Sequence, residues 1–399
     1  MSDSQYVEKN LNFDELVPRQ NTDSLKYDFA TRRGKPSNVL PLWVADMDFK
    51  TSSIVLDILK ARVEHGIFGY TETKEDYFNA VVSWMLKRHE WQVNERWLIK
   101  TPGVVVALAA GVKAFTKPGD AVLIQQPVYY PFSEVVLDND RKLVSNDLVV
   151  DDEGHWSIDF ADFERKIVAE QVHLFILCSP HNPVGRVWTK EELSQIADIC
   201  QRHDVIIMSD EIHHDFVYSP HKHQVLAALD PKIADRTITC TSPGKTFNLA
   251  GLQVSNIFIS NPKLRQAFKK QIATMGYSQL GTMGIVACEA AYNYGEVWFE
   301  AVLRYINANI EFVQEFLAQH LPEVKLKRPE GTYLIWLDFR GLGLSEQELT
   351  DLIDRKALLW VDHGNIFGAV GNGFERINVA CPRQTLVEAL TRLEHALKA

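Results

Sequence analysis

The chain has 399 residues, of which 46% are hydrophobic and 24% are charged, an ordinary composition for a globular protein of two domains. Its 52 acidic and 42 basic side chains give a formal net charge of -10, which argues against a nucleic-acid or anionic-membrane binder. The polar first ten residues lack the apolar core of a signal peptide. Five dispersed cysteines without a Cys-x-x-Cys pair indicate a reducing compartment, so a cytoplasmic location is expected.

The middle of the chain alternates short apolar runs with helical patterns. The apolar, β-rich runs lie at residues 121–125, 173–178, 204–209, 237–241 and 255–260. Residues 189–202 have helical spacing and acidic residues in the first turn. Strands that alternate with helices predict an α/β fold, with a mostly parallel sheet covered by helices on both faces.

The last third of the chain has a different pattern. Residues 324–339, 358–361 and 374–379 are expected to be strands, and residues 384–398 a closing helix. This pattern predicts a smaller α+β domain. We therefore expect an N-terminal arm at 1–48 that joins the small domain, a large domain at 49–289 and a small domain at 290–399.

Lys245 directly follows a predicted strand, where ligands of open α/β sheets bind. Its sequence Gly-Lys-Thr also closes the Walker A phosphate loop, but that pattern needs a glycine where Thr239 stands. A second interpretation is a lysine that forms a Schiff base with an aldehyde, which requires an unprotonated amine. The third is a solvated loop lysine. The neighbouring motifs favour the second interpretation.

Three further polar residues follow predicted strands. Asp210 ends an apolar run, and a buried carboxylate needs a partner, which is either a protonated ring nitrogen or a structural group. Asn182, in Asn-Pro-Val-Gly, is either a turn residue or a donor to a ligand oxygen. Tyr129 either stacks on an aromatic ligand or packs in the core.

Two motifs are suited to anions. The sequence Thr-Pro-Gly-Val-Val places Gly103, Val104 and Val105 at the start of a predicted helix, whose first N–H groups can converge on a phosphate. Arg383 opens the last helix and has the planar fork that binds a carboxylate, although a surface arginine is the simpler interpretation.

Four histidines follow Asp210 within a short stretch. They are His213, His214, His221 and His223. Their spacing matches no standard zinc pattern, and no cysteine lies near them. We therefore expect no metal site.

Taken in order, these motifs resemble the fold-type I pyridoxal-phosphate (PLP) enzymes of aminotransferase class I/II, from about Leu40 to the end of the chain. The resemblance implies the PLP-dependent transferase-like fold, with PLP held covalently by Lys245. It also implies that Asp210 pairs with the ring nitrogen, that Asn182 and Tyr129 contact the ring, and that Arg383 binds the substrate carboxylate. Gly103, Val104, Val105 and Ser242 would hold the phosphate.

Within this superfamily the chain most resembles the cystathionine β-lyase type of C–S lyases. Residues 41–49, which include Ala45 and Asp46 as expected substrate contacts, carry part of the resemblance, as do residues 65–71. His213 stands where aminotransferases usually have tyrosine, and is expected to contact the cofactor. Gln253 stands where many have a phosphate-binding arginine. Tyr70 of a second subunit would then help to bind the phosphate, which implies a homodimer with shared active sites.

The resemblance implies a PLP-dependent β-lyase that cleaves cystathionine or related cysteine S-conjugates to a thiol, pyruvate and ammonia. Its substrate is a small amino acid, and no nucleic-acid or membrane partner is expected. Three alternatives stay open at this stage. They are an aminotransferase with the same residues, a nucleotide-binding protein built on Gly-Lys-Thr, and a regulatory protein that binds PLP without turnover.

Overall fold

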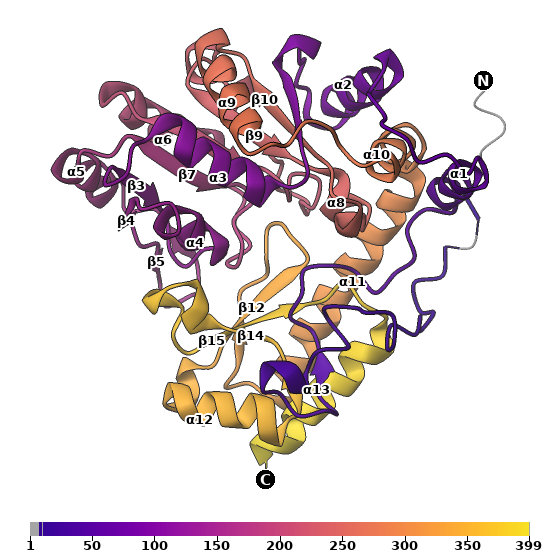
Figure 1. Ribbon diagram of the computed structural model, residues 1–399. Coiled ribbons are helices and arrows are strands. Elements are labelled where there is room, and N and C mark those ends of the chain that lie inside the picture. Colours follow the sequence, from indigo (N-terminus) through magenta and orange to yellow (C-terminus); the bar gives the residue numbers. More distant parts are fainter. Residues whose placement is uncertain (1–7, 10, 399) are drawn as a thin grey trace.

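The computed structural model describes residues 8, 9 and 11–398. The chain forms a larger α/β unit, which lies at the top of Figure 1, and a smaller α+β unit below it. A mostly parallel sheet covered by helices, with a smaller α+β unit beside it, is the architecture predicted from the sequence.

The large unit is built on a seven-stranded sheet with the order β2-β10-β9-β8-β7-β3-β4. Pairing is parallel from β9 through to β4, whereas β10 runs antiparallel to both of its neighbours. The five predicted strands are all present. The strand bounds are β2 Leu98–Thr101, β3 Ala121–Ile124, β4 Lys142–Ser145, β7 Leu174–Cys178, β8 Ile206–Asp210, β9 Thr237–Thr241 and β10 Ser255–Ile259.

Helices cover both faces of this sheet because the side chains of each strand alternate between the faces. Leu123, Phe175 and Ile207 pack with α5 and α6 on one face. Ile176 and Met208 pack with α3, α4 and α9 on the other face. The helix bounds are α1 Ser53–Glu64, α2 Glu75–His89, α3 Val104–Phe115, α4 Pro131–Leu137, α5 Phe160–Glu170, α6 Lys190–Arg202, α7 Pro231–Ala234, α8 Pro243–Thr246, α9 Pro262–Thr274 and α10 Thr282–Tyr294.

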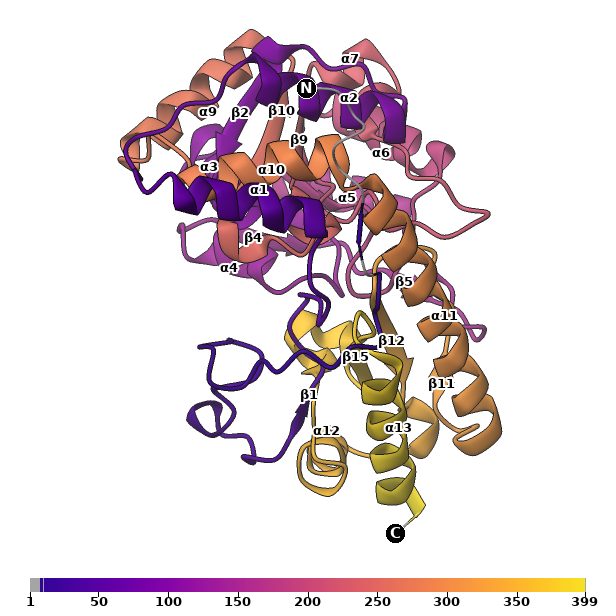
Figure 2. The same ribbon diagram turned by 90° about the vertical axis from the view of Figure 1, so that its right-hand side faces the viewer.

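The small unit contains a four-stranded antiparallel sheet with the order β11-β12-β15-β14. The long helix α11 runs from the large unit into the small one, and α13 packs against it (Figure 2). The bounds are α11 Glu296–His320, β11 Lys325–Leu326, β12 Leu334–Asp338, α12 Glu346–Asp351, β13 Leu359–Trp360, β14 Asp362–His363, β15 Phe374–Asn378 and α13 Arg383–Lys398. A separate hairpin pairs β5 Val149–Val150 with β6 Trp156–Ser157.

Two details differ from the sequence-based expectation. The single strand expected at 324–339 is two strands, β11 and β12, which pair with each other in antiparallel fashion. The domain boundary expected at residue 290 falls inside α10. The N-terminal arm contributes the short strand β1 Leu40–Pro41, which pairs with β13 of the small unit.

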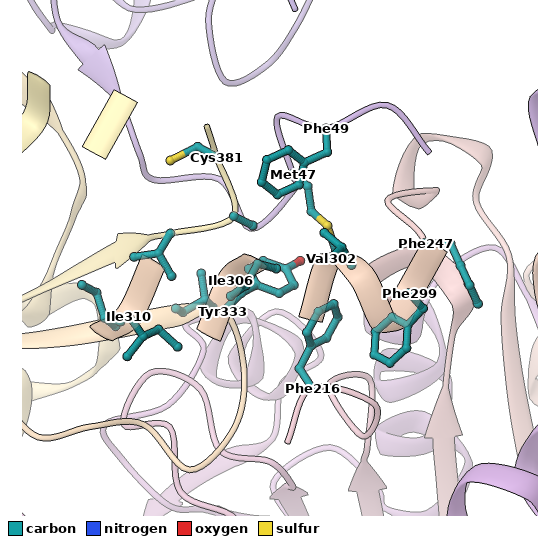
Figure 3. Close-up of a cluster of buried hydrophobic side chains, with 14 of the residues drawn as sticks. Met47, Phe49, Phe216, Phe247, Phe299, Val302, Ile306, Ile310, Tyr333 and Cys381 are labelled. Carbon is teal, nitrogen blue, oxygen red and sulfur yellow. The ribbon is translucent and has the colours of Figure 1, made fainter. Parts of the chain in front are cut away.

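An apolar cluster joins the two units along α11 (Figure 3). Met47 and Phe49 from the arm lie near Val302 of this helix, and Phe216 and Phe247 come from the large unit. Among the residues that the structure describes, no helix is both long and apolar enough to cross a membrane.

Candidate active site

A cavity of about 340 Å³ lies at the carboxyl ends of β7, β8 and β9. It is the edge of the sheet at which the sequence predicts the site, because polar residues follow the parallel strands there. Most of the predicted site residues line this one cavity. They are Ala45, Gly103, Val104, Val105, Tyr129, Asn182, Asp210, His213, Ser242 and Lys245.

Lys245 lies in α8, the short helix that follows β9, and its amine donates to the carbonyl oxygen of Ala45 over 2.6 Å. Burial lowers the pKa of this amine to about 8, partly offset by the negative charges of Asp46 and Asp210. A buried ammonium is costly because it loses its hydration. The amine is therefore neutral, and nucleophilic, at pH values just above 8.

Asp210 ends β8 and is buried beside the cavity. Its Oδ1 accepts a hydrogen bond from the backbone N–H of Ile212 over 3.1 Å. Burial raises the pKa of the Asp210 carboxyl to about 7. A cationic ring nitrogen placed against this carboxylate would restore the charged form, so the site is suited to a protonated pyridine.

The start of α3 forms the anion-binding wall of the cavity. Gly103 has an extended backbone, and among the described residues no side chain caps this 12-residue helix. Residues 103–106 line the cavity, so the first-turn N–H groups and the positive end of the helix dipole are available to a phosphate. The Ser242 hydroxyl also lines the cavity, but its oxygen accepts from Gly244 N over 2.9 Å and its proton goes to Val254 O over 2.7 Å.

Sequence reasoning missed Arg376, which β15 places beside the cavity. Its Nη1 donates to Asn182 Oδ1 over 3.0 Å, and its Nη2 donates to Trp43 O over 2.9 Å and to Asp362. Its buried Nε has no hydrogen-bond partner in the described part of the chain. The available signal was an arginine inside a predicted strand, because a fully buried arginine needs a functional or structural partner.

Arg383 does not lie where the sequence analysis expects it. Its Nε donates to Asn309 Oδ1 over 2.8 Å, and its guanidinium lies 4.5 Å from the centre of the Phe312 ring. The cavity-lining residues do not include it. Within the described chain Arg383 is thus bonded to α11 and not to the cavity, and its role as the ligand of the substrate carboxylate stays a prediction.

Asp46 and Tyr70 also lie outside the cavity walls. Asp46 forms an ion pair with Arg19, with Oδ2 and Nη2 2.6 Å apart, although its neighbour Ala45 does line the cavity. Tyr70 is 99% exposed and lines a separate surface groove with residues 276–284. The role predicted for Tyr70 concerns the active site of a second chain, and it and the substrate contact predicted for Asp46 stay predictions.

His213 lines the cavity and packs edge-on against Tyr333, with ring centres 5.7 Å apart. Burial holds the pKa of His213 well below its usual value, so the imidazole is neutral. Its buried Nδ1 has no hydrogen-bond partner among the described residues, and a ligand in the cavity could supply one.

Residues 37–393 match the family model described as aminotransferase class I and II, and the chain belongs to this family. The cystathionine beta-lyase PatB of Bacillus subtilis is 42% identical over 97% of this chain and 100% of its own length.

Two solved structures that contain pyridoxal 5'-phosphate are closely similar. Cystalysin from Treponema denticola has a TM-score of 0.94 at 40% identity, over 97% of this chain and 98% of that chain. A putative aminotransferase from Clostridium difficile 630 has a TM-score of 0.95 at 42% identity, over 97% of this chain and 100% of that chain.

The residues present fit PLP. The neutral amine of Lys245 matches its aldehyde, the Asp210 carboxylate matches its ring nitrogen, and the uncapped start of α3 matches its phosphate. The start of α3 has no side-chain cap among the described residues. The Lys245 amine and the Asp210 carboxylate each form a hydrogen bond with the backbone, and a ligand could replace it or add to it.

The lowered pKa of Lys245 predicts how the apoprotein takes up PLP. Because only the neutral amine reacts, the rate of covalent attachment should rise with pH and level off above about 8. The growth of the bound-cofactor absorbance, followed at a series of pH values, measures this rate. A midpoint near 10.5, the ordinary value for lysine, would contradict the burial argument.

Proposed function

We propose that this protein is a PLP-dependent C–S β-lyase that cleaves cystathionine or a related cysteine S-conjugate to a thiol, pyruvate and ammonia. The observation that carries the proposal is the joint placement of Lys245 and Asp210 in one cavity of a chain 42% identical to a cystathionine beta-lyase. Bound PLP supplies the electron sink that stabilises negative charge at the substrate Cα.

Each residue then has a defined task. Lys245 would hold PLP covalently through its amine, and the same amine, when free, would take the proton from the substrate Cα. Asp210 keeps the ring nitrogen protonated, which matters most when negative charge develops. The electrons left at Cα expel the thiolate from Cβ. Lys245 is suited to this task because burial lowers the pKa of its amine to about 8, so more of the amine is neutral than for an ordinary lysine.

We assign the substrate carboxylate to Arg376 instead of Arg383. Arg376 is 2% exposed, bonds to the cavity residue Asn182, and lies over the Phe367 ring at 4.9 Å, all of which fix the plane of its guanidinium. Trp43 O and Asp362 both accept from Nη2, whereas Nε has no partner among the described residues. A fixed fork binds a carboxylate with two charge-assisted hydrogen bonds.

This assignment predicts different effects for the two arginines. Arg376→Lys keeps the charge but loses the planar fork, so kcat/KM should fall about 10- to 100-fold, the equivalent of one charge-assisted hydrogen bond. Arg383→Lys, the matched control, should stay within a few-fold of wild type. Steady-state kinetics with cystathionine measure both variants, and the reverse order of effects would restore Arg383 as the carboxylate ligand.

A second candidate is an aminotransferase, which would use the same residues. One of the two closely similar PLP-bound structures is that of a putative aminotransferase, which favours including this candidate. The two activities differ in their need for an acceptor, because transamination requires a 2-oxo acid and β-elimination does not.

The lyase proposal predicts pyruvate and free thiol from cystathionine without any added 2-oxo acid. Both products are measured with the purified holoenzyme, with and without 2-oxoglutarate. Strict dependence on the 2-oxo acid would replace the lyase by the aminotransferase. Loss of all turnover despite bound PLP would favour a regulatory PLP-binding protein.

We also propose a homodimer in which each active site takes Tyr70 from the partner chain. Tyr70 belongs to an exposed apolar surface with Ile67 and Phe68, which are 66% and 59% exposed. Such a surface is typical of an interaction site.

A cytoplasmic location is part of the proposal, and the five cysteines, all free and buried, are consistent with a reducing compartment.

Shared sites predict complementation between two inactive variants. Tyr70→Ala and Lys245→Ala should each lose most activity alone. In a mixed dimer, one site receives Lys245 from one chain and Tyr70 from the other, so random mixing should restore about a quarter of wild-type activity. The variants are unfolded and refolded together before assay. Verified mixed dimers without activity would rule out sharing through Tyr70.

A further inference from the structure

A buried group of histidines and one aspartate lies in the large unit, outside the cavity walls. We call it the histidine cluster; its members are His89, His214, Asp215 and His223. His89 is the last residue of α2, whereas the other three follow β8. The ligand-type atoms of His89, His214 and Asp215 all lie within 4.8 Å of one another. All three are nearly inaccessible to solvent, with side chains 4%, 1% and 0% exposed.

The three imidazole rings lie close together. The ring centres of His89 and His214 are 4.5 Å apart, those of His89 and His223 are 5.6 Å apart, and those of His214 and His223 are 6.1 Å apart. Three protonated rings at these distances would repel one another, so a charge shared within the cluster must be balanced by Asp215.

In His214 and His223, one ring nitrogen contacts Glu211 and the other has no hydrogen-bond partner among the described residues. His214 Nδ1 contacts the backbone oxygen of Glu211, which can only accept, so this nitrogen carries the proton. His223 Nε2 lies 2.8 Å from the Glu211 carboxylate. The opposite atoms, His214 Nε2 and His223 Nδ1, are buried and have no hydrogen-bond partner among residues 8, 9 and 11–398. His214 Nε2 is 3.2 Å from Asp215 Oδ2, but not in hydrogen-bond geometry.

The Asp215 carboxylate is oriented in the same manner. It accepts from Thr246 Oγ1 over 2.6 Å and from Trp84 Nε1 over 3.2 Å at both oxygens, and His89 Nε2 lies 2.9 Å from Oδ1. Histidines that bind metals usually donate their second nitrogen to a carboxylate or backbone carbonyl, and metal-bound carboxylates accept further hydrogen bonds. The histidine cluster has both features.

We propose that His89, His214 and Asp215, whose ligand-type atoms lie within 4.8 Å of one another, bind a divalent transition-metal ion of the zinc class. Zinc accepts imidazole nitrogen and carboxylate oxygen as ligands, and imidazole also binds Cu²⁺ and Ni²⁺. The inference replaces the sequence-based expectation of no metal. Sequence motifs for zinc sites require ligands that lie close together in the chain. His89 lies far from His214, Asp215 and His223 in sequence, so no motif could reveal the cluster.

The site would be structural. Asp215 accepts from Thr246, the residue next to Lys245, so the ion would tie the end of α2 and the loop after β8 to the helix that carries the lysine. No substrate or cofactor atom is needed for binding. The inference is therefore independent of the proposed lyase function.

The test measures metal binding by the holoenzyme. The protein is treated with a chelator, freed of it, and titrated with Zn²⁺ or Co²⁺. We expect one ion per chain by elemental mass spectrometry, the visible spectrum of tetrahedral Co²⁺, and a higher melting temperature with Zn²⁺. His89→Gln and His214→Gln should each weaken binding at least about 10-fold, the lower limit for losing even an outer partner. His221→Gln is the matched control, because this histidine lies in the same loop with a 39% exposed side chain.

The control should bind like wild type. A wild-type protein that takes up less than one ion per chain overturns the proposal, as does unchanged binding by both cluster variants, or loss of binding in His221→Gln. Circular dichroism verifies that each variant is folded. If His214→Gln does not fold, the wild-type stoichiometry and His89→Gln, altered at the end of a helix, decide the question.

Discussion

The active region depends on the burial of two ionisable groups of opposite charge type in one cavity. β8 and β9 are adjacent and parallel, and Asp210 pairs in register with Cys240, so the strands deliver Asp210 and Lys245 to the same edge of the sheet. Burial raises the pKa of the carboxyl to about 7 and lowers that of the amine to about 8. Both groups are thereby moved toward their neutral forms, and both lose solvation that a bound aldehyde with a cationic ring would compensate.

The N-terminal arm completes the cavity because both units hold it. Asn248, three residues after Lys245, donates to Met47 O over 2.9 Å and to Phe49 O over 3.0 Å. Asn378, two residues after Arg376, donates to the carbonyl oxygens of Val44 and Asp46 over 2.6 and 2.5 Å. Between these anchors, the Ala45 carbonyl accepts from both Lys245 and Tyr333. The side chains of Met47 and Phe49 pack beside α11 (Figure 3). The arm therefore acts as a part of the site whose position depends on both units.

Local sequence patterns were enough to predict the central strands and the edge of the sheet at which the site lies. The apolar runs that became β3, β7, β8, β9 and β10 are buried on both faces, and the polar residues after them lie at one edge. The edge strands β2 and β4 were missed because each carries a lysine, Lys100 or Lys142, which interrupts the apolar run. Alternation with helices predicted a mostly parallel sheet, but it did not predict that β10 is antiparallel to its neighbours, because periodicity is the same in both directions.

What the sequence did not reveal about the site has a related cause. Both arginines near the end of the chain are plausible carboxylate ligands by residue type, and only tertiary contacts separate Arg376, bonded to Asn182, from Arg383, bonded to Asn309. His89 joins His214 only through folding. The role proposed for Tyr70, a contact in the active site of a partner chain, requires a second chain.

The most direct test of the account is chemical trapping of the cofactor. Borohydride reduction of the yellow holoenzyme fixes PLP to the lysine that holds it, and peptide mass spectrometry then locates the modified residue. The account predicts modification of Lys245, with a Lys245→Ala protein that binds no cofactor covalently and has no turnover. Reduction that places PLP on a different lysine would contradict the assignment on which the cavity, the chemistry and the role of Asp210 all depend.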